Sequence, residues 1–559
     1  MSDGLRRWAI GDRRWAMLGA LVALALGASV VGLQNGFTYD DRYIIEWNES
    51  VHSLSNGGWW KLFGQSYWPK AWGSDGYRPL TMLLYLFEWV AGRGTPSVFH
   101  AVNIALNAAT TIAVFALAGL LLPVWAAWLA AALFAVHPVH VEAVANIVGQ
   151  SELLVALLTV VSLHLYVRGR RAGALSGSAA AVIVGMYALA CLTKEHGIVL
   201  PALLIMAELL LVDDRRSILT RLREHRPFAL GLVAVALGFV FVRSIVLREN
   251  GVAGFHPFIV FQTLNLSYID RVLTMFGVVP EWVRLVLWPA RLSMDYTPPA
   301  IDIAQGPALN QLPGFLLLVG VLGLAVALWR RRPLTSFGIA FAVITLLPSS
   351  NFIIPAGIIL AERTLYLPTV GVLLAMADAF VWAAPYFRVR WIRVLTASAM
   401  GTLIAAGTVS SARRTTVWHD NERLFRRTVA DYPNSYRAHF MLGSWAFSVQ
   451  RLSEGESEFQ RAIALFPFDP SPAMALAEQY RRIGTCPQAI KYYRLAQAID
   501  SKLGHVDMAR CLVRQRQYAE AKDQIRTAMQ IAGGTPFLHR MLVWVDTKAA
   551  SDSGTAASR

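Results

Sequence analysis

The sequence predicts an all-α protein: a polytopic membrane helix bundle followed by a C-terminal α-solenoid. Of its 559 residues, 55% are hydrophobic and only 16% are charged, whereas soluble domains carry roughly 25% charged residues. Long uncharged runs recur as far as residue 411, and beyond it charges become frequent. This composition excludes an intrinsically disordered chain, a collagen-like chain and a small disulfide scaffold.

The first predicted span is the uncharged run from Trp15 to Leu33, which follows Arg6, Arg7, Arg13 and Arg14. The run is longer than the apolar core of a cleavable signal peptide, so we expect a retained helix with a cytoplasmic N-terminus. Ten further runs of spanning or near-spanning length bring the predicted total to about eleven: 98–121, 124–136, 147–167, 174–193, 197–212, 227–247, 312–329, 335–348, 365–384 and 394–411.

The charges of the short loops orient these spans. If the helices alternate, the cytoplasmic segments hold 18 Lys and Arg against 5 Asp and Glu, and the first outside loop, 34–97, holds 5 against 6. Cytoplasmic loops of membrane proteins carry this basic excess. The net charge of +15, which in a soluble protein would indicate nucleic acid, is therefore chiefly a topology signal, and we expect no nucleic-acid partner.

Two segments need a different interpretation. Residues 255–311 lack a convincing span, because Asp270, Arg271 and Glu281 interrupt the run; interfacial helices or a re-entrant hairpin are expected there.

Residues 412–548 repeat small and aromatic positions with a period of 34 that relaxes to 32, as in Gly455, Ala489 and Ala521. That period is typical of tetratricopeptide repeats, which would lie on the extracytoplasmic side. We expect a disordered tail over 549–559.

The three cysteines are Cys191, Cys486 and Cys511. An odd number without a C-x-x-C pair indicates neither a disulfide framework nor a zinc site. A bridge between Cys486 and Cys511 on an oxidising face stays open.

Groups capable of chemistry gather at the predicted extracytoplasmic ends of the spans. Two adjacent carboxylates, Asp40 and Asp41, follow the first span. Because adjacent side chains diverge, one of them can face a cleft as a general base while the other holds the loop. A solvated acidic loop is the alternative. Four more clusters lie on the same side: Tyr77-Arg78-Pro79-Leu80, His137-Pro138-Val139-His140-Val141-Glu142, Lys194-Glu195-His196 and Ala361-Glu362-Arg363-Thr364-Leu365-Tyr366. Ionisable groups near bilayer depth are costly, so their recurrence on one side predicts a pocket at the membrane surface.

The ordered set of motifs resembles that of the transmembrane and tetratricopeptide-repeat O-mannosyltransferases, which belong to the GT-C superfamily of membrane glycosyltransferases. The resemblance covers nearly the whole chain, and these motifs carry it: Tyr39-Asp40-Asp41, Tyr77-Arg78-Pro79-Leu80, Phe99-His100-Ala101-Val102-Asn103, His137-Pro138-Val139-His140-Val141-Glu142-Ala143-Val144, Lys194-Glu195 and Ala361-Glu362-Arg363-Thr364-Leu365-Tyr366-Leu367-Pro368. It implies a GT-C-like domain over 1–411.

The resemblance also implies an inverting transfer of a sugar, mannose first, from a polyprenyl- or dolichyl-phosphate donor to Ser or Thr hydroxyls of secreted or membrane proteins. The base would be Asp40 or Asp41, and Glu142 would bind the sugar or orient the base. Arg78, Lys194 and Arg363 would offset the charge of the departing phosphate. Glu195, Glu362, His137 and His140 are assigned to substrate or phosphate binding. No cofactor or divalent metal is indicated by the sequence.

Two alternatives stay open. The same donor could serve a lipid or cell-wall glycan acceptor, or the chain could be a non-enzymatic, membrane-anchored repeat scaffold. The repeats here are few compared with the eukaryotic pattern, so they could bind a protein partner instead of a substrate. We expect an integral protein of the bacterial inner membrane, or of the endoplasmic reticulum membrane if the source is eukaryotic, in contact with membrane lipids.

Overall fold

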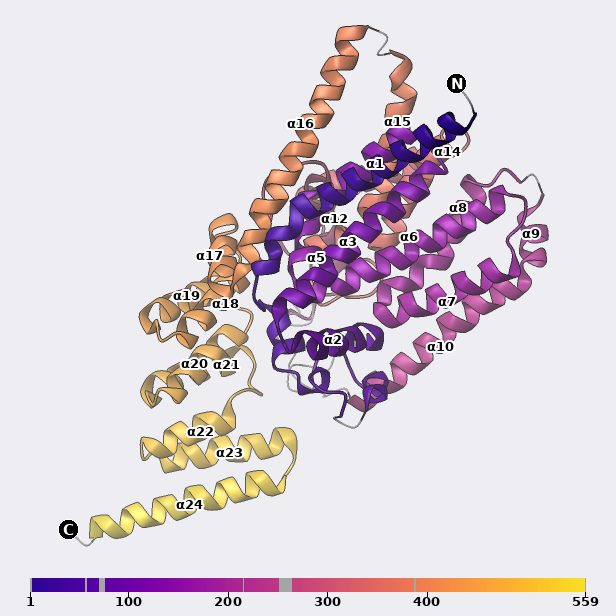
Figure 1. Cartoon of the computed structure of the whole chain (residues 1–559). Coiled ribbons are helices and arrows are strands. Elements are labelled where there is room, and N and C mark those ends of the chain that lie inside the picture. Colours follow the sequence, from indigo (N-terminus) through magenta and orange to yellow (C-terminus); the bar gives the residue numbers. More distant parts are fainter. Residues whose placement is uncertain are drawn as a thin grey trace. The chain divides into compact units, whose positions relative to one another are not determined.

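The computed structural model describes residues 3–55, 58–69, 76–214, 216–250, 264–386 and 389–557. Within these ranges the regular structure is helical throughout and no strand occurs (Figure 1), which confirms the all-α class. The chain divides into two compact units. The membrane unit comprises Met1–His256, Tyr268–Met294 and Ala304–Leu424, and the repeat unit comprises Pro257–Ser267, Asp295–Ile303 and Phe425–Arg559.

The membrane unit contains the helices from α1 to α16, and some of their connections include short 3-10 or π turns. Their bounds are α1 Asp3–Ser29, α2 Pro79–Gly92, α3 Pro96–Gly119, α4 Val124–Ala135, α5 Val141–Ala145, α6 Gln150–Arg171, α7 Gly177–Thr193, α8 Leu200–Leu210, α9 Ile218–Glu224, α10 Arg226–Asn250, α12 Tyr268–Leu287, α13 Leu312–Leu328, α14 Pro333–Leu346, α15 Pro368–Ala383 and α16 Arg390–Thr415.

Seven helical stretches among the described residues are long and apolar enough to cross a membrane, and the bent pair of α4 with Pro138–Ala145 makes an eighth if it counts as one span. The seven are Arg14–Gln34, Pro96–Gly119, Ile147–Arg171, Arg226–Arg248, Leu309–Leu328, Pro368–Tyr386 and Arg390–His419. The chain is therefore an integral membrane protein.

The sequence predicts about eleven spans of full or near-full length, and seven or eight stretches of full spanning length occur among the described residues. Helices occur at all eleven places, but those at 124–136, 174–193, 197–212 and 335–348 have 12, 17, 11 and 14 residues in α4, α7, α8 and α14, and a full span needs about 20. The apolar run at 124–136 ends in a 48° bend before Pro138. Hydropathy shows that a run is apolar but not where its helix begins and ends.

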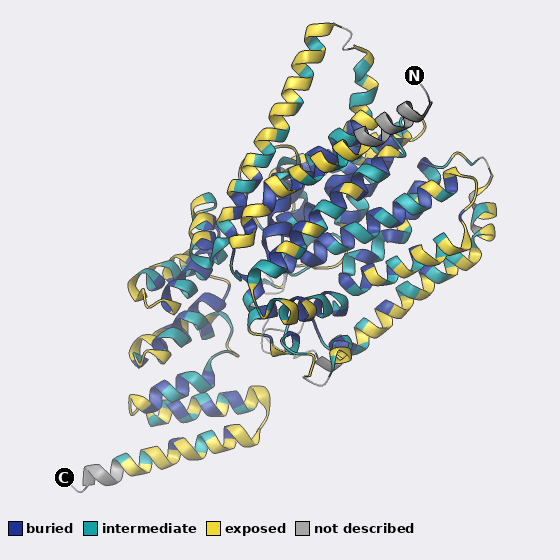
Figure 2. Ribbon diagram, in the orientation of Figure 1, coloured by how far each residue is buried: buried dark blue, intermediate teal, exposed yellow. Residues whose placement is uncertain are grey.

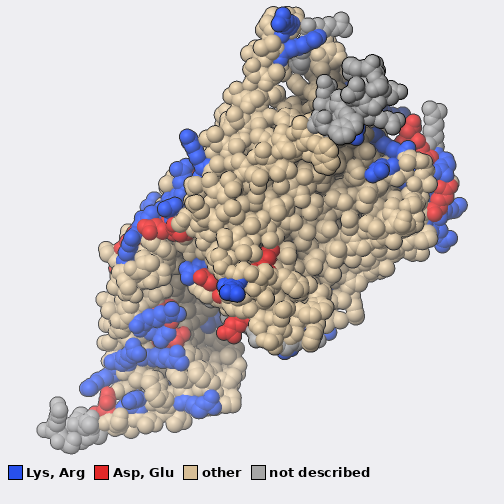
Figure 3. Space-filling model, in the orientation of Figure 1, with Lys and Arg blue, Asp and Glu red and all other residues tan. Residues whose placement is uncertain are grey.

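The outer surface of the membrane unit is apolar. The exposed side chains of α10, α13 and α16 include Leu237, Phe241, Leu316, Val319 and Leu403, and exposure along α10 and α16 is visible in Figure 2. In Figure 3 a broad part of this unit's visible face carries almost no charge, and Lys and Arg gather near its ends. An apolar belt between charged ends is the pattern that a bilayer requires.

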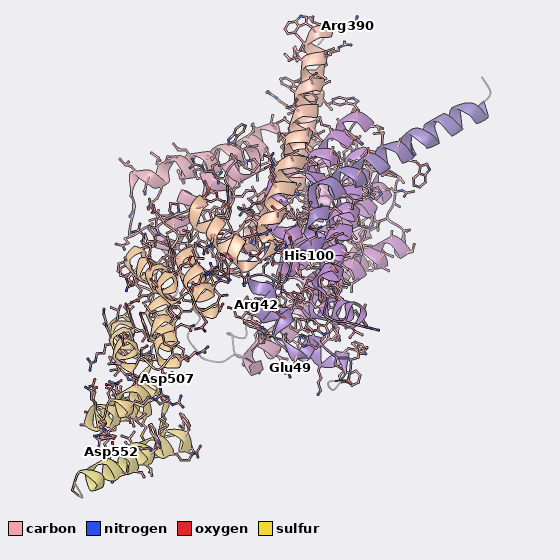
Figure 4. All side chains as sticks on the ribbon, turned by 60° about the vertical axis from the view of Figure 1, so that its left-hand side comes forward. Arg42, Glu49, His100, Arg390, Asp507 and Asp552 are labelled. Atoms are coloured by element: carbon pink, nitrogen blue, oxygen red, sulfur yellow. The ribbon has the colours of Figure 1, made fainter. Side chains whose placement is uncertain are left out.

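The helix ends separate the charged groups as the loop charges predict. Figure 4 shows Arg390 at one tip of α16 and places His100, Arg42 and Glu49 far from that tip. Arg390 belongs to a predicted cytoplasmic segment, and the other three belong to or adjoin the predicted outer loop 34–97. The sidedness itself stays a prediction.

The segment 255–311 forms one described helix, α12, which contains Pro280 and is not among the stretches that satisfy the requirements of a span. Residues 255–263 lie outside the described residues. From 288 to 308 the chain is free of helix. The prediction of an interfacial or re-entrant segment therefore stays a prediction.

The repeat unit consists of helices that pack in consecutive pairs, α18 with α19, α20 with α21 and α22 with α23. Their bounds, with those of the flanking α17 and α24, are α17 Asn421–Asp431, α18 Tyr436–Ser448, α19 Leu452–Leu465, α20 Ser471–Arg482, α21 Cys486–Ile499, α22 His505–Arg514, α23 Tyr518–Ala532 and α24 Pro536–Ala557.

The second helices of the three pairs begin at residues 452, 486 and 518, which reproduces the spacing of 34 and then 32 read from the sequence. The small residues of that period are buried where helices meet: a Cβ on Gly455 would lie 2.5 Å from the ring of Phe447, and Ala489 and Ala521 are fully buried. This arrangement is consistent with tetratricopeptide repeats.

Helix α24 extends to Ala557. The disordered tail that the sequence predicts over 549–559 stays a prediction.

Candidate active site

The two carboxylates of the first loop are held in a tightly bonded turn of the membrane unit. After the first span the chain runs through Gly36, whose amide donates to the carbonyl of His419 at 3.0 Å. Tyr39 then adopts a φ of +51°, a left-handed conformation that residues other than glycine rarely take. Its amide donates to Oδ1 of Asn421 at 2.9 Å. The residues just after the last span thus fix the position of the loop.

Asp41 is a structural carboxylate. It is fully buried, and its two oxygens accept different backbone amides, Thr38 N–H at 3.1 Å and Val148 N–H at 2.9 Å. Burial raises the pKa of Asp41 to about 8 despite these two hydrogen bonds. Asp41 therefore joins the first loop to the turn before α6, which is the loop-holding role expected for one member of the pair.

Asp40 keeps a small exposed surface, 8% against 0% for Asp41. Its negative charge acts on Arg363 and on Tyr67, and it raises the pKa of both. Asp40 is thus the member of the pair that faces the cationic groups.

Arg363 lies in the short turn Glu362–Leu365 before α15. Its Nη1 contacts Oε1 of Glu142, and its backbone amide donates to Oε2 of the same carboxylate at 2.8 Å. Glu142 is 1% exposed, so both of its oxygens are committed to Arg363. The structure makes Glu142 a positioning residue for this guanidinium.

Lys194 and Glu195 point to different partners because Lys194 is extended between α7 and the next turn, with φ −158° and ψ 146°. The Lys194 ammonium contacts Oε1 of Glu152 in α6, and both side chains are almost fully buried. Burial lowers the pKa of Lys194 to about 8, and the charges of Arg78 and Arg363 act in the same direction.

Arg78 precedes Pro79, the first residue of α2. Its Nε donates to Oε2 of Glu195 at 3.0 Å, and the amide of Tyr77 donates to Oε1 at 3.0 Å. The guanidinium lies over the ring of Tyr67, 4.5 Å from its centroid. Burial alone would raise the pKa of Glu195, but Arg78 and the backbone amides lower it to about 2.

These pairs form one electrostatically connected cluster. Asp40 and Glu152 both raise the pKa of Arg363, Arg363 and Arg78 both lower that of Lys194, and Glu152 raises that of Arg78. The structure therefore brings together three cations, each held by its own carboxylate, with the Asp40–Asp41 pair beside them. Groups from five separate stretches of sequence meet here.

Three predicted site residues have other partners. His137 Nε2 contacts the carbonyl of Val286 at 2.9 Å, and His140 lies between the carbonyl of Phe134 at 2.9 Å and Thr369 Oγ1 at 2.7 Å. Glu362 accepts the amide of Ser293. These contacts hold the bend after α4 against α12 and α15.

Sequence reasoning missed Glu152 and the polar residues that hold its helix. The side-chain nitrogen of Asn103 in α3 lies within 3.3 Å of the carbonyls of Val144, Asn146 and Ile147. Gln150 Nε2 donates to Asn103 Oδ1 at 3.1 Å and to Glu88 at 2.8 Å. The available signal was Gln150-Ser151-Glu152, three polar residues at the start of an apolar run.

A separate pocket of about 270 Å³ lies in the first loop, lined by Glu49, Trp59, Lys61, Gln65 and Leu86 among others. None of the predicted site residues lines it. In the described part of the chain, no three His, Cys, Asp or Glu side chains gather as ligands for a metal ion.

Comparison with known proteins confirms the resemblance to the O-mannosyltransferases. The chain is 25% identical over 483 residues to human protein O-mannosyl-transferase TMTC4 (77% of this chain, 63% of the relative), 23% identical over 500 residues to human TMTC3 (83% and 53%), and 27% identical over 542 residues to Drosophila melanogaster Tmtc1 (79% and 60%). The chain thus spans between about half and two thirds of the length of these relatives.

No family model matches the chain. Among solved structures, the archaeal oligosaccharyltransferase AglB from Archaeoglobus fulgidus, in complex with an inhibitory peptide and a dolichol-phosphate, aligns with 82% of this chain and 60% of its own at 14% identity and a TM-score of 0.38. A structural similarity of that degree does not support a conclusion about this chain.

Proposed function

We propose that this chain is an inverting glycosyltransferase that moves a sugar, most simply mannose, from a polyprenyl- or dolichyl-phosphate donor to Ser or Thr hydroxyls of proteins. The observation that carries the proposal is the cluster of three carboxylate-held cations, Arg78, Lys194 and Arg363, beside Asp40. The relatives named as protein O-mannosyl-transferases support the sugar and the protein acceptor.

The cations match the charge that develops during transfer. A lipid-phosphate sugar is a phosphodiester with one negative charge, and loss of the sugar leaves a phosphate monoester with up to two. Preorganised cations in a site poor in water stabilise that added charge. Arg78 donates to Glu195 through Nε, which leaves its two Nη groups to face a phosphate, while Glu195 prevents the side chain from moving.

The reaction needs one base and no nucleophile of the enzyme. The acceptor oxygen attacks C1 of the sugar from the face opposite the phosphate, the C1–O bond to phosphate breaks, and the hydroxyl proton passes to a carboxylate. We assign the base to Asp40, because both oxygens of Asp41 are engaged by backbone amides. A single displacement of this kind inverts the anomeric centre and forms no covalent sugar–enzyme intermediate.

The location of the cluster suits a lipid-linked donor. Its residues lie next to the ends of α1, α6, α7 and α15, so the isoprenoid tail could lie along apolar spans while the phosphate meets the cations. The basic excess of the opposite loops supports an extracytoplasmic active site with the N-terminus in the cytoplasm. We assign the protein to a bacterial inner membrane, or to the endoplasmic reticulum membrane if the source is eukaryotic.

The decisive experiment incubates the purified full chain with radiolabelled polyprenyl-phosphate-mannose and three acceptor classes: a Ser/Thr peptide library, a lipid and a cell-wall glycan. We expect label on the peptides, with inverted anomeric configuration. Asp40→Asn should lower kcat at least about 100-fold, the usual size of a general-base contribution. Added EDTA should leave the rate unchanged.

Asp41→Asn is the matched control for Asp40→Asn, because it changes the neighbouring carboxylate that holds the loop. We expect it to lower the melting temperature as well as the rate. If only the glycan or the lipid is labelled, that molecule and not a protein is the acceptor. No transfer by the folded wild type to any acceptor would contradict the enzymatic function and leave the repeat scaffold as the explanation.

A further inference from the structure

Two of the three cysteines of the chain meet in the repeat unit. Cys486 is the first residue of α21, and Cys511 lies in α22, the next helix along the chain. The Sγ of Cys486 lies 2.7 Å from the Sγ of Cys511, and the two residues are 1% and 0% exposed.

This separation is too short for two thiols that are not bonded. Non-bonded heavy atoms rest at roughly 3.5–4.0 Å, and sulfur is larger than carbon, while a thiol is only a weak hydrogen-bond donor. The helices that carry the sulfurs are fixed by packing of Leu476, Ala489 and Leu512, all fully buried. The backbone therefore holds the two sulfurs closer than non-bonded contact, and a small rotation of the side chains would bring them to the roughly 2.05 Å of a disulfide.

Other roles for the pair fit less well. In the described part of the chain no third His, Cys, Asp or Glu joins them in a metal-binding group. A redox-active thiol needs access and a stabilised thiolate, whereas Cys511 is buried and its burial raises its pKa to about 12. A disulfide that forms before the helices pack over it, and is buried afterwards, agrees with both facts.

We propose that Cys486 and Cys511 form a structural disulfide that joins two successive repeats. The two thiols lose two protons and two electrons, and these reduce the disulfide of an extracytoplasmic thiol–disulfide exchange protein to its dithiol. The proposal rests on the extracytoplasmic placement of the repeat unit given under the proposed function, because cytosolic thiols are kept reduced.

The chain contains its own control for the test. Cys191 is buried in α7 of the membrane unit and cannot take part. Intact cells that express the full chain are treated with a permeant maleimide and lysed in denaturant with the same reagent, which prevents later oxidation, and the protein is weighed by mass spectrometry. We expect one alkylated cysteine without prior reduction and three after reduction.

The variant Cys191→Ser should then show no alkylation without reduction, and the pair Cys486→Ser with Cys511→Ser should show one alkylated cysteine under both conditions. Loss of the bond should also lower the melting temperature of the repeat unit by several degrees. Three alkylated cysteines in unreduced wild type would overturn the proposal.

A second measurement tests the extracytoplasmic placement of the repeat unit independently of the disulfide. In a chain without native cysteines, Ala532→Cys places one exposed thiol at the end of α23. Labelling of this thiol on cells or spheroplasts by an impermeant maleimide supports the outer placement. Three free native thiols together with outer labelling would refute the disulfide alone, and three free thiols without labelling would refute the disulfide and the topology together.

Discussion

At the scale of single residues, the site depends on carboxylates that hold cations in place. Glu142, Glu152 and Glu195 each engage one of Arg363, Lys194 and Arg78. The Lys194–Glu152 pair is almost fully buried, and the other two pairs are partly exposed. A buried ion pair loses hydration that its own attraction only partly restores, so the convergence of three ion pairs at one place indicates a function other than stability. The carboxylates fix where each cation points before an anionic donor arrives.

Lys194 gives the site a pH dependence. Its pKa of about 8 means that the ammonium loses its proton as the pH rises through 8, so one of the three cations disappears above that value. We expect the KM for the lipid-phosphate donor to rise about tenfold per pH unit above 8. Steady-state kinetics from pH 6 to 9.5 would measure it.

Lys194→Arg is the control for this prediction, because arginine stays charged throughout that range. The variant should show a flat KM between pH 7 and 9.5, whatever its absolute rate. If the variant and the wild type lose donor affinity in parallel, Lys194 is not the titrating group.

Asn103 holds the turn that contacts the first loop, without contacting that loop itself. Its amide nitrogen holds the turn 144–147, and the next residue, Val148, donates to Asp41. Asn103→Ala should lower kcat more than about tenfold, because small displacements of catalytic groups are costly, and should destabilise the fold by about 1–3 kcal/mol through unpaired carbonyls. Transfer kinetics and thermal unfolding in detergent would check both effects.

The matched control lies one turn further along α3. Asn107 is also buried, and its Oδ1 accepts the hydroxyl of Tyr366 at 2.8 Å. Asn107→Ala should destabilise the protein by a similar amount and leave kcat within about twofold. Equal losses of kcat in the two variants would show that Asn103 acts only through stability.

Sequence patterns identified most of the charged residues of the site but not their pairing. The motifs pointed to Asp40, Arg78, Lys194 and Arg363, and the structure brings these together. Glu152 was missed because nothing in its spacing relates it to Lys194. The resemblance assigns His137 and His140 to substrate binding, which stays a prediction, and the sequence does not show that each ring contacts a backbone carbonyl and a second protein group.

At the scale of elements, two membrane helices approach closely where two glycines meet. Gly338 of α14 and Gly371 of α15 face each other so closely that a Cβ on Gly371 would lie 2.4 Å from the carbonyl oxygen of Gly338. Small residues let membrane helices approach in this way. Element positions could be predicted from apolar runs, but this contact could not, because α14 and α15 are each too uniformly apolar to reveal which face packs.

A single methyl group at this contact should separate the two helices. We expect Gly371→Ala to destabilise the protein by about 1–3 kcal/mol, the usual effect of overpacking, measured as a lower melting temperature in detergent. Gly320→Ala in α13 is the control, since a Cβ there meets nothing within 4 Å. A stable Gly371→Ala variant would mean that the helices can move apart without loss.

At the scale of the whole molecule, the residues just after the last span belong with the compact membrane unit, which includes the chain as far as Leu424. The shift in composition at residue 411 predicts a domain boundary there, and that boundary stays a prediction. Residues in the stretch 412–424 hold the first loop: His419 accepts the amide of Gly36, and Asn421 that of Tyr39. Composition cannot reveal such contacts, because they join residues more than 380 positions apart.

The role of residues 412–424 can be tested with two truncated chains. A chain that ends at 412 loses His419 and Asn421, whereas one that ends at 424 keeps them. We expect the longer chain to transfer sugar to a short peptide at least about tenfold faster than the shorter chain, because only it keeps the loop positioned for catalysis. If thermal unfolding shows that both chains are folded and their rates are equal, the loop contacts do not contribute to catalysis.

The repeat unit also contains a stretch that the chain supplies from between α12 and α13. Asp295 accepts the hydroxyl of Ser435, and the amide of Tyr436 donates to the carbonyl of Pro298. A gene segment that encodes only the C-terminal part would not bring this stretch with it. A recombination event that exchanges only the C-terminal part would therefore separate Ser435 and Tyr436 from these two partners.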